Sequence, residues 1–472
     1  MKIVMATINP LFDSQVIGGS AKHLRAVAEH LGNLGHTVEV LCTRREGQPS
    51  VMSWHPRVNV YPAFVFKQPF PLPYDVPAFQ FADNIQELVR HLQGADRLYL
   101  HDGEFLFPPV CHAIPSVVSL RDCVYPETML GSFLFQADRM IVLNDYCKKS
   151  LLSTAGRFLA DLPARVDVIH NGFDWDYFSP TRPSKAILQL LGVDPNRQTV
   201  ILHPHRPETS KGLRQTIEVV DRLIHQHKLT HVKVLVPKWF DSDDTPEVVA
   251  YMRSIEQDLG RRGLKEVFVF HDWLPLDMMP EYYSLGHVTL VLGSFVEAFG
   301  NSAYESLGCG TPAIVSRVSS NRDLLPDNLL RKVHFNDHDT AASLAAEVIK
   351  KRIRTSPETQ EYLEEHYGVD NQCEAYARVI LNAKKAPPMT YRLTPHSHAT
   401  RYALAPWCYT WDDKVYHDFR AAHTTDAELV RYVKEFPEGT TWDEAGARGF
   451  SKDHLKLRLR EGFLAPVDVE GG

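Results

Sequence analysis

The sequence has no closely paired cysteines and no long apolar run. Its seven cysteines are odd in number, scattered over 472 residues and never spaced as C-x-x-C, so neither a disulfide framework nor a zinc ribbon is expected. A reducing, cytoplasmic environment fits this usage. No stretch reaches about 18 uninterrupted apolar residues, so no transmembrane helix is indicated. The apolar run within residues 1–10 is too short for a signal peptide.

An excess of charge of one sign is also missing. Lysine and arginine together number 51 and aspartate and glutamate 58, which gives a formal net charge of −7. This balance argues against a protein coated with basic charge for nonspecific nucleic-acid binding, so any site for an anion must be local. Hydrophobic residues make up 44% of the chain and charged residues 23%, which excludes a largely disordered or coiled-coil protein.

Short apolar runs alternate with helical patterns over the first 180 residues. Apolar residues recur at helical spacing from Leu24 to Leu34, and Gly35 ends that pattern. Runs of β-branched and aliphatic residues occur at 3–7, 38–42, 98–100, 117–120, 140–143 and 166–169. These runs are mostly unalternated, as expected of strands covered on both faces. The pattern predicts an α/β fold with a parallel, doubly wound sheet.

The same pattern restarts after Pro183. Further strands are predicted at 200–203, 232–236, 267–270, 288–292 and 313–315. Because the chain is about three times the commonest domain size, we expect two Rossmann-like domains facing a cleft and a third, small part. The predicted parts are two Rossmann-like domains, a helix and linker returning toward the first domain, and a small, mainly helical extension (a candidate winged helix-turn-helix), at 1–185, 186–360, 361–388 and 389–472.

An acidic loop follows the predicted strand at 288–292. Glu297 precedes Phe299, Gly300 and Asn301, and Glu305 falls in the next predicted helix. Loops at the carboxyl ends of strands bind ligands in open α/β sheets. Eight helical residues would separate the two carboxylates by roughly 12 Å, more than the roughly 5 Å between the paired acids of a retaining hydrolase. We therefore expect the two glutamates to contact different parts of one ligand.

Two cations and a glycine pair are placed to bind an anion. Arg206 and Lys211 lie in a loop after the predicted strand at 200–203. There the two-pronged guanidinium of the arginine and the mobile ammonium of the lysine can both bind a diphosphate. Gly18 and Gly19 precede the first helix, whose free backbone N–H groups favour an anion. Each element is weak alone, and their combined placement on two doubly wound units is the stronger indication.

Four stretches of the sequence carry a family resemblance. They are residues 18–24 with 35–40, 170–174 with Phe178 and Pro180, Arg206 with 211–212, and 297–312. With these motifs the chain resembles a retaining GT-B glycosyltransferase of the large family that contains sucrose synthase and many bacterial mannosyl- and glucosyltransferases, the glycosyl transferases group 1. The resemblance covers about residues 1–385, and it implies that 1–185 form the acceptor domain and 186–360 the nucleotide-sugar donor domain.

The resemblance implies roles for the donor-site residues. Arg206 and Lys211 would hold the donor diphosphate and offset the charge that grows on the leaving nucleotide. Glu305 would bind the ribose hydroxyls, and Glu297 with the backbone N–H groups of residues 299–301 would bind sugar and phosphate. No metal and no other cofactor would be needed, and the donor would be a UDP- or GDP-linked sugar. The transferred group would be a hexose or a pentose.

The sequence departs from the family pattern in two places. The residue before the diphosphate arginine is usually glycine, whereas this chain has His205. The family often ends its fifth strand with a histidine near the reacting sugar, whereas the corresponding strand here leads into Arg121 and Asp122. His101 and Asp102, at the end of the preceding predicted strand, are the substitute candidates. The catalytic residue of the N-terminal domain stays open.

Two further segments have competing interpretations. The acidic run at 241–244 resembles a metal-binding Asp-x-Asp, but Thr245 and Pro246 follow it, so we interpret it as a helix N-cap and expect no metal site. Residues 61–79 are rich in phenylalanine, tyrosine and proline. They form either a rigid acceptor-binding loop or an irregular surface connection.

The extension has the rhythm of a helix-turn-helix with a trailing strand. Helices are predicted at 427–436, 441–447 and 452–460, and a strand follows Gly462. From residue 389 onward we count 11 basic and 13 acidic residues, which lacks the excess positive charge of a duplex-binding domain. Basic residues do gather on the last helix, at Lys452, Lys456, Arg458 and Arg460. A structural or protein-contacting role is favoured over nucleic-acid binding.

The preferred hypothesis is a metal-independent enzyme that transfers a sugar from a nucleotide diphosphate to an acceptor hydroxyl with retained configuration. No residue is placed to form an evident covalent intermediate, so a front-face displacement assisted by the leaving phosphate is expected. The alternatives are transfer to a modified base in nucleic acid through the extension, a nucleotide-sugar epimerase, a pyridoxal-dependent phosphorylase and a non-enzymatic nucleic-acid binder. The sequence leaves the donor base, the sugar, the acceptor (small molecule, glycan, lipid or nucleic acid) and the oligomeric state open.

Overall fold

The computed structural model describes residues 1–12, 19–66, 75–103, 108–122, 124–238, 246–392 and 397–467. The chain forms two compact units, unit 1 with Met1–His170 and Gln372–Gly472, and unit 2 with Asn171–Asn371. Gly18 and the acidic run at 241–244 lie outside the described residues. Each unit is described by itself.

The units divide at residues 170/171 and 371/372, whereas the sequence pattern places the domain boundaries at 185 and 360. Aromatic packing explains the first difference. Phe173 stacks on Tyr304 with ring centroids 5.6 Å apart and lies 6.1 Å from the ring of Phe299, so the segment after Asn171 belongs to unit 2. At the second boundary the side chain of Gln372 lies 3.0 Å from the buried ring of His23 in unit 1.

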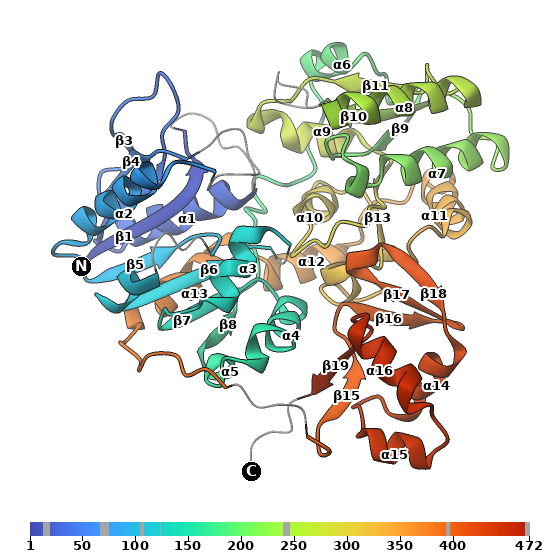
Figure 1. Cartoon of the computed structure of the whole chain (residues 1–472). Helices are drawn as coiled ribbons and strands as arrows, with labels where there is room; N and C mark the ends of the chain where they lie inside the picture. The colour runs from blue at the N-terminus through green and yellow to red at the C-terminus, as the bar shows by residue number, and fades with distance from the viewer. Residues whose placement is uncertain are drawn as a thin grey trace. The chain divides into compact units, whose positions relative to one another are not determined.

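An eight-stranded sheet forms the centre of unit 1, in the order β3-β4-β2-β1-β5-β6-β7-β8 (Figure 1). All neighbouring strands are parallel except β3 and β4. The strands are β1 (Lys2–Pro10), β2 (Thr37–Thr43), β3 (Met52–His55), β4 (Val58–Phe64), β5 (Arg97–Leu100), β6 (Ser116–Leu120), β7 (Arg139–Val142) and β8 (Val166–Val168). The apolar runs predict all of these except β3 and β4. In β4, buried and half-buried positions alternate, which breaks the apolar run.

Helices cover this sheet because one face of each is apolar. In the first of them Leu24, Val27, Ala28 and Leu31 are buried, at the spacing that the sequence predicts. The helices are α1 (Gly19–Asn33), α2 (Ala78–Leu92), α3 (Pro126–Phe133), α4 (Asp145–Leu152), α5 (Leu162–Arg165) and α13 (Val369–Asn382). The last of these returns to unit 1 across the boundary, where Arg97 donates hydrogen bonds to its carbonyl oxygens.

Unit 2 is built on a six-stranded, fully parallel sheet in the order β11-β10-β9-β12-β13-β14. Its strands are β9 (Thr199–Leu202), β10 (Val232–Pro237), β11 (Phe268–His271), β12 (Val288–Val291), β13 (Ala313–Ser316) and β14 (Arg331–Val333). Its helices are α6 (Lys185–Leu191), α7 (Leu213–His225), α8 (Pro246–Arg262), α9 (Met279–Leu285), α10 (Asn301–Gly308), α11 (His338–Lys350) and α12 (Pro357–His366). The sequence predicts every strand but β14, which is short and carries two cations.

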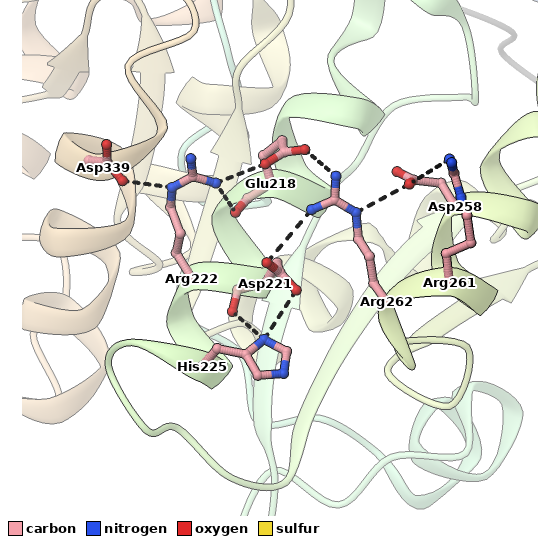
Figure 2. Close-up of polar contacts among 8 residues, drawn as sticks. All are labelled: Glu218, Asp221, Arg222, His225, Asp258, Arg261, Arg262 and Asp339. Carbon is pink, nitrogen blue, oxygen red and sulfur yellow. Dashed lines mark hydrogen bonds and ion pairs between the residues drawn. The ribbon is translucent and has the colours of Figure 1, made fainter.

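A network of ion pairs joins α7, α8 and α11 on the surface of unit 2 (Figure 2). Arg222 pairs with Glu218 at 2.8 Å and with Asp339 at 2.7 Å. Arg262 pairs with the same Glu218 and with Asp258. Single exposed ion pairs contribute little, and a network that shares side chains contributes more. This cluster therefore holds helices together.

The extension contains three helices at the predicted places, α14 (Ala427–Glu435), α15 (Trp442–Ala447) and α16 (Lys452–Arg460). The sequence pattern predicts the strand that follows Gly462, β19 (Leu464–Val467), but not the other four, which are β15 (Arg401–Leu404), β16 (Cys408–Trp411), β17 (Lys414–His417) and β18 (Ala422–Thr425). β15 pairs with β19, and β16–β18 form an antiparallel sheet. On α16, Arg458 pairs with Asp426 and Lys452 with Asp443, each at 2.6 Å, so two of the four clustered cations are engaged within the extension. Within the described ranges, no helix combines the length and apolarity needed to cross a membrane.

Candidate functional site

The connection order of unit 2 reverses between β9 and β12. The chain runs from β9 to β10 on one side, and β12 pairs with β9 on the other. Ligands of open α/β sheets bind at such a switch point, outside the carboxyl ends of the strands. The loops after these two strands, 203–212 and 292–300, contain the predicted donor-site residues Arg206, Lys211 and Glu297.

Backbone contacts hold the two loops together. The carbonyl oxygen of Ser210 accepts hydrogen bonds from the N–H groups of Ser294 and Phe295, at 2.8 and 3.0 Å. Gly212 has φ of +87°, and a Cβ there would overlap the backbone nitrogen of Gly293. Glycine is therefore required at 212 for both its conformation and its close approach.

This contact brings Lys211 and Glu297 together. The Lys211 ammonium lies 2.6 Å from the Glu297 carboxylate and 3.5 Å from the centroid of the Phe295 ring. The backbone of Glu297 is also fixed, because its carbonyl oxygen accepts hydrogen bonds from the hydroxyls of Ser319 and Ser320, both at 2.8 Å. The ammonium has three donors, so it can bind an anion while it keeps Glu297.

Arg206 lies in the same loop as Lys211, and both charges act on His205. Its Nε donates to Glu208 at 2.8 Å, and about a third of its side chain is exposed. The pKa of His205 is lowered to about 3, first by desolvation and then by the charges of Lys211 and Arg206. Both cations therefore lie near one neutral imidazole. His205 replaces the family's glycine, and its Nε2 lies 3.2 Å from the hydroxyl of Ser302 on α10.

The loop before α10 offers backbone rather than side-chain groups. Phe299 is 2% exposed and packs on Tyr304 with ring centroids 4.7 Å apart, so its side chain belongs to the core. Gly300 caps α10 with φ of +82°. The amide of Asn171 donates to the side-chain oxygen of Asn301 at 2.9 Å. The N–H groups of residues 299–301 remain the feature of this loop that suits an anion.

Glu305 lies in α10, as the sequence predicts, and is half-buried. Its carboxylate accepts a hydrogen bond from the hydroxyl of Tyr283 at 2.9 Å. This environment differs from that of Glu297, which faces an ammonium.

Unit 1 has its own switch point, between β1 and β5. The hydroxyl of Ser20 donates to the Asp102 carboxylate at 2.5 Å, and the amide of Asn9 donates to the same oxygen at 3.2 Å. His101 Nε2 lies 2.8 Å from the Ser20 hydroxyl and 3.0 Å from the Ser20 carbonyl oxygen. The two predicted residues, His101 and Asp102, therefore form one cluster with Ser20, which follows Gly19 at the start of α1.

The protonation of this cluster follows from its contacts. A carbonyl oxygen only accepts, so Nε2 of His101 carries the hydrogen, and Nδ1 accepts from the Tyr99 hydroxyl at 2.8 Å. Burial, and then the charge of Arg121, hold the pKa of His101 well below its ordinary value. Burial raises the pKa of Asp102. Asp102 has φ of +67°, and its Oδ1 has no hydrogen-bond partner among the described residues.

Arg121 and Asp122 face different groups. Arg121 donates to the hydroxyl of Tyr376 on α13 at 2.8 Å. Asp122 accepts from the N–H groups of Val124 and Tyr125 and, at 2.7 Å, from the hydroxyl of Thr128. Burial raises the pKa of Asp122 to about 6. Asp122 thus caps the turn into α3, while Arg121 connects the sheet to α13.

Several supporting residues were not predicted as site residues. They are Asn9, Tyr99, Tyr283, Ser319 and Ser320. The position of the two serines could have indicated a site role, since they follow the predicted strand at 313–315 at the same edge of the sheet. No sequence feature indicates the two tyrosines, because only the folded chain brings them to the site. Among the described residues no cluster of three or more histidine, cysteine or acidic side chains is placed to hold a metal.

Two protein families match the chain. Glycosyltransferase Family 4 matches residues 17–177, and Glycosyl transferases group 1 matches residues 193–367. These matches fall on the two sheets and leave out the extension.

Curated relatives are distant. The putative glycosyltransferase YtcC of Bacillus subtilis (strain 168) is 22% identical over 190 residues, which cover 37% of this chain and 45% of YtcC. The D-inositol 3-phosphate glycosyltransferase of Mycobacterium sp. (strain JLS) is 30% identical over 187 residues, 39% of this chain and 38% of that protein. The chain thus matches less than half of the length of these two relatives.

Solved structures share the fold. The sucrose-phosphate synthase from Thermosynechococcus elongatus superposes with a TM-score of 0.65 at 16% identity, over 80% of this chain and 98% of that one. Anabaena HepE, solved in complex with UDP and glucose, gives a TM-score of 0.63 at 17% identity, over 80% and 99% of the chains. With two parallel sheets, each matched by a glycosyltransferase family, the chain belongs to the GT-B glycosyltransferases of the group 1 family.

Proposed function

We propose that the protein is a retaining, metal-independent glycosyltransferase that moves a sugar from a UDP- or GDP-linked donor to an acceptor hydroxyl. The observation that supports this proposal is the ion pair of Lys211 with Glu297 at 2.6 Å at the switch point of unit 2, next to His205, whose pKa the charges of both Lys211 and Arg206 lower. A diphosphate needs two fixed cations when it leaves water, and a metal ion is the usual alternative.

The cations stabilise the departing nucleotide. Negative charge grows on the β-phosphate as the bond to the sugar breaks, and donors already in place lower the barrier by roughly 3 kcal/mol each. Lys211 is already oriented by Glu297 and by the Phe295 ring. Arg206 supplies a fork that matches two phosphate oxygens.

The remaining donor contacts come from the loop before α10. Glu297 binds sugar hydroxyls while it orients Lys211, and the backbone N–H groups of residues 299–301 bind a phosphate at the positive end of α10. Glu305, held by Tyr283, binds the ribose hydroxyls.

The acceptor side is the cluster of Ser20, His101 and Asp102 in unit 1. Its imidazole is neutral and its hydroxyl is oriented by a carboxylate, so it can form hydrogen bonds to an acceptor hydroxyl. The proton of the acceptor hydroxyl passes to the leaving phosphate in a front-face displacement. No protein nucleophile is required.

Nucleotide binding tests this proposal. UDP, GDP, ADP, TDP and their sugars are added in a thermal-shift assay, where a ligand at about 100 times its Kd adds roughly 2.7 kcal/mol of stability. HepE was solved with UDP and glucose, so UDP-glucose is the first donor to try. One base should stabilise the wild type, and Arg206→Ala should remove that shift. Arg197→Ala, in a pair that leaves Arg197 87% exposed, should keep it. Shifts of equal size in all three proteins would contradict the proposal.

A further inference from the structure

A cavity of about 310 Å³ lies within unit 1. Its walls come from the ends of β6 and β7, from α3 and α4, and from the extension. The extension is anchored there by a buried contact, because the Tyr146 hydroxyl on α4 donates to the Asp418 carboxylate at 2.8 Å. The cavity therefore exists only because the extension covers this part of the sheet edge.

The walls of this cavity are mainly apolar. Leu120, Val142 and Leu151 line it from the sheet and α4, and Trp407 and Phe419 line it from the extension. Its volume is about twice that of a cavity that holds benzene, and at the lower end of the range for ligand sites. One or two rings fit, whereas a long lipid or a folded peptide does not.

Two buried polar atoms in the wall lack hydrogen-bond partners among the described residues. They are Oγ of Ser150 and Nδ1 of His417. The two residues are 6% and 5% exposed. A buried polar group without a partner costs about 1–3 kcal/mol, so it calls for a ligand or a water. Burial lowers the pKa of His417, so its imidazole is neutral. Ser150 and His417 therefore add neutral polar groups to an otherwise apolar wall.

The cavity reaches the edge that carries the acceptor cluster. Asp122 and Thr128 line it, and the Thr128 hydroxyl donates to Asp122 at 2.7 Å. The same hydroxyl lies 3.5 Å from the carbonyl oxygen of Asp102. Thr128 thus belongs to the wall of the cavity and also contacts a residue of the cluster of Ser20, His101 and Asp102.

We propose that this cavity binds the apolar part of the acceptor, a compact alcohol or phenol with one or two rings and one neutral polar substituent. The inference rests on the proposed function. The two family matches end at residue 367, so the part of the wall made by Trp407, His417 and Phe419 lies outside both. The extension then acts as the element that selects the acceptor.

Direct binding tests the location. 2-Naphthol is titrated into the full-length protein by calorimetry, with no donor present. Met129 and Leu130 are neighbours on α3 with exposures of 46% and 51%, but only Met129 lines the cavity. Met129→Trp should fill the cavity and weaken binding about tenfold or more, whereas Leu130→Trp should leave it unchanged. Absence of binding, or equal binding in both variants, overturns the proposal.

Transfer tests the role in acceptor binding. The nucleotide sugar that stabilises the protein is incubated with ring-containing alcohols, including 2-naphthol, or with glucose or glycerol, and products are weighed by mass spectrometry. Products on the ring-containing alcohols, with KM raised in Met129→Trp, support the proposal. Products on glucose or glycerol alone, or no product although both donor and naphthol bind, overturn it. Failure of the proposed function is distinct, because no nucleotide would then bind while naphthol binding to the wild type and to Lys211→Ala persists.

Discussion

The two sheets place their switch points in the same way but surround them with different charges. Between β9 and β12 the loops carry Arg206 and Lys211, with a carboxylate 2.6 Å from the ammonium. Between β1 and β5 the loops carry a neutral histidine, a serine and Asp102, whose pKa is raised by burial. The unit 2 edge therefore carries cations that suit an anion, and the unit 1 edge carries hydroxyl, imidazole and carboxyl groups that suit a hydroxylated molecule.

Under the proposed function, this difference divides a two-substrate reaction between the two sheets. A charged donor must find compensation for the water it loses, which fixed cations provide. An acceptor hydroxyl needs orientation and a polar partner, which neutral groups provide at a smaller desolvation cost. The proposed roles follow from the charge at each edge, since the backbone of the two sheets is similar.

Removing the Lys211 ammonium from the unit 2 edge should have the largest effect, which is on kcat. Lys211→Ala should lower kcat roughly 100- to 1,000-fold, because one fixed donor to the developing charge is lost. The rate of nucleotide release from the donor measures this. Lys351→Ala, which breaks a 2.8 Å pair with Glu347 at a residue 67% exposed, should have no effect. A Lys211→Ala rate within about tenfold of wild type would mean that the cation is not needed.

The contact that joins the two unit 2 loops should be the next most sensitive feature. Gly212→Ala forces a side chain into a positive φ and against Gly293, which should destabilise unit 2 by about 3 kcal/mol or more. Gly192 also has positive φ, but no atom lies within 4 Å of its added Cβ. Gly192→Ala should therefore cost only about 1 kcal/mol. Urea denaturation midpoints compare the two variants. Equal losses would show that the loops do not depend on this approach.

The unit 1 edge should respond in rate but not in nucleotide affinity. Asp102→Asn keeps the positive φ, which asparagine tolerates, and changes the charge beside Ser20. We expect kcat to fall about 10- to 100-fold, with the Kd for nucleotide unchanged in calorimetry. Asp412→Asn is the control, because Asp412 also has positive φ and is exposed in the extension. A weakened nucleotide Kd in Asp102→Asn would remove the division between the two edges.

The sequence predicts the two sheets well, because unalternated apolar runs report strands buried on both faces. It also places Lys211 and Glu297 at one edge, since both follow predicted strands. It does not predict β3 and β4, where polar residues interrupt the run, nor β16–β18, whose strands have four residues each.

Contacts between segments that are distant in the sequence could not be predicted from the sequence pattern. Ser20 and Asp102 are 82 positions apart, and their hydrogen bond depends on the order of strands β1 and β5. The cavity depends on a contact between Tyr146 and Asp418, 272 positions apart. Helical periodicity places α14–α16 correctly but contains no information about what the extension packs against.

The smallest expected effect is the change in unfolding free energy that accompanies protonation of Asp122 at the unit 1 edge. Burial raises the pKa of Asp122 from 3.8 to about 6, so its contribution to stability is complete below pH 3.8 and is lost as the pH rises through about 6. Asp122→Asn keeps the side-chain oxygen that accepts from Val124 and Tyr125 but does not titrate. Between about pH 4 and 7, the wild type should therefore lose about 2 kcal/mol of unfolding free energy relative to this variant, measured by urea denaturation. Asp412→Asn should give no such divergence. If the curves of wild type and Asp122→Asn stay parallel, burial does not favour the protonated form of Asp122, and its pKa is not raised in the folded state.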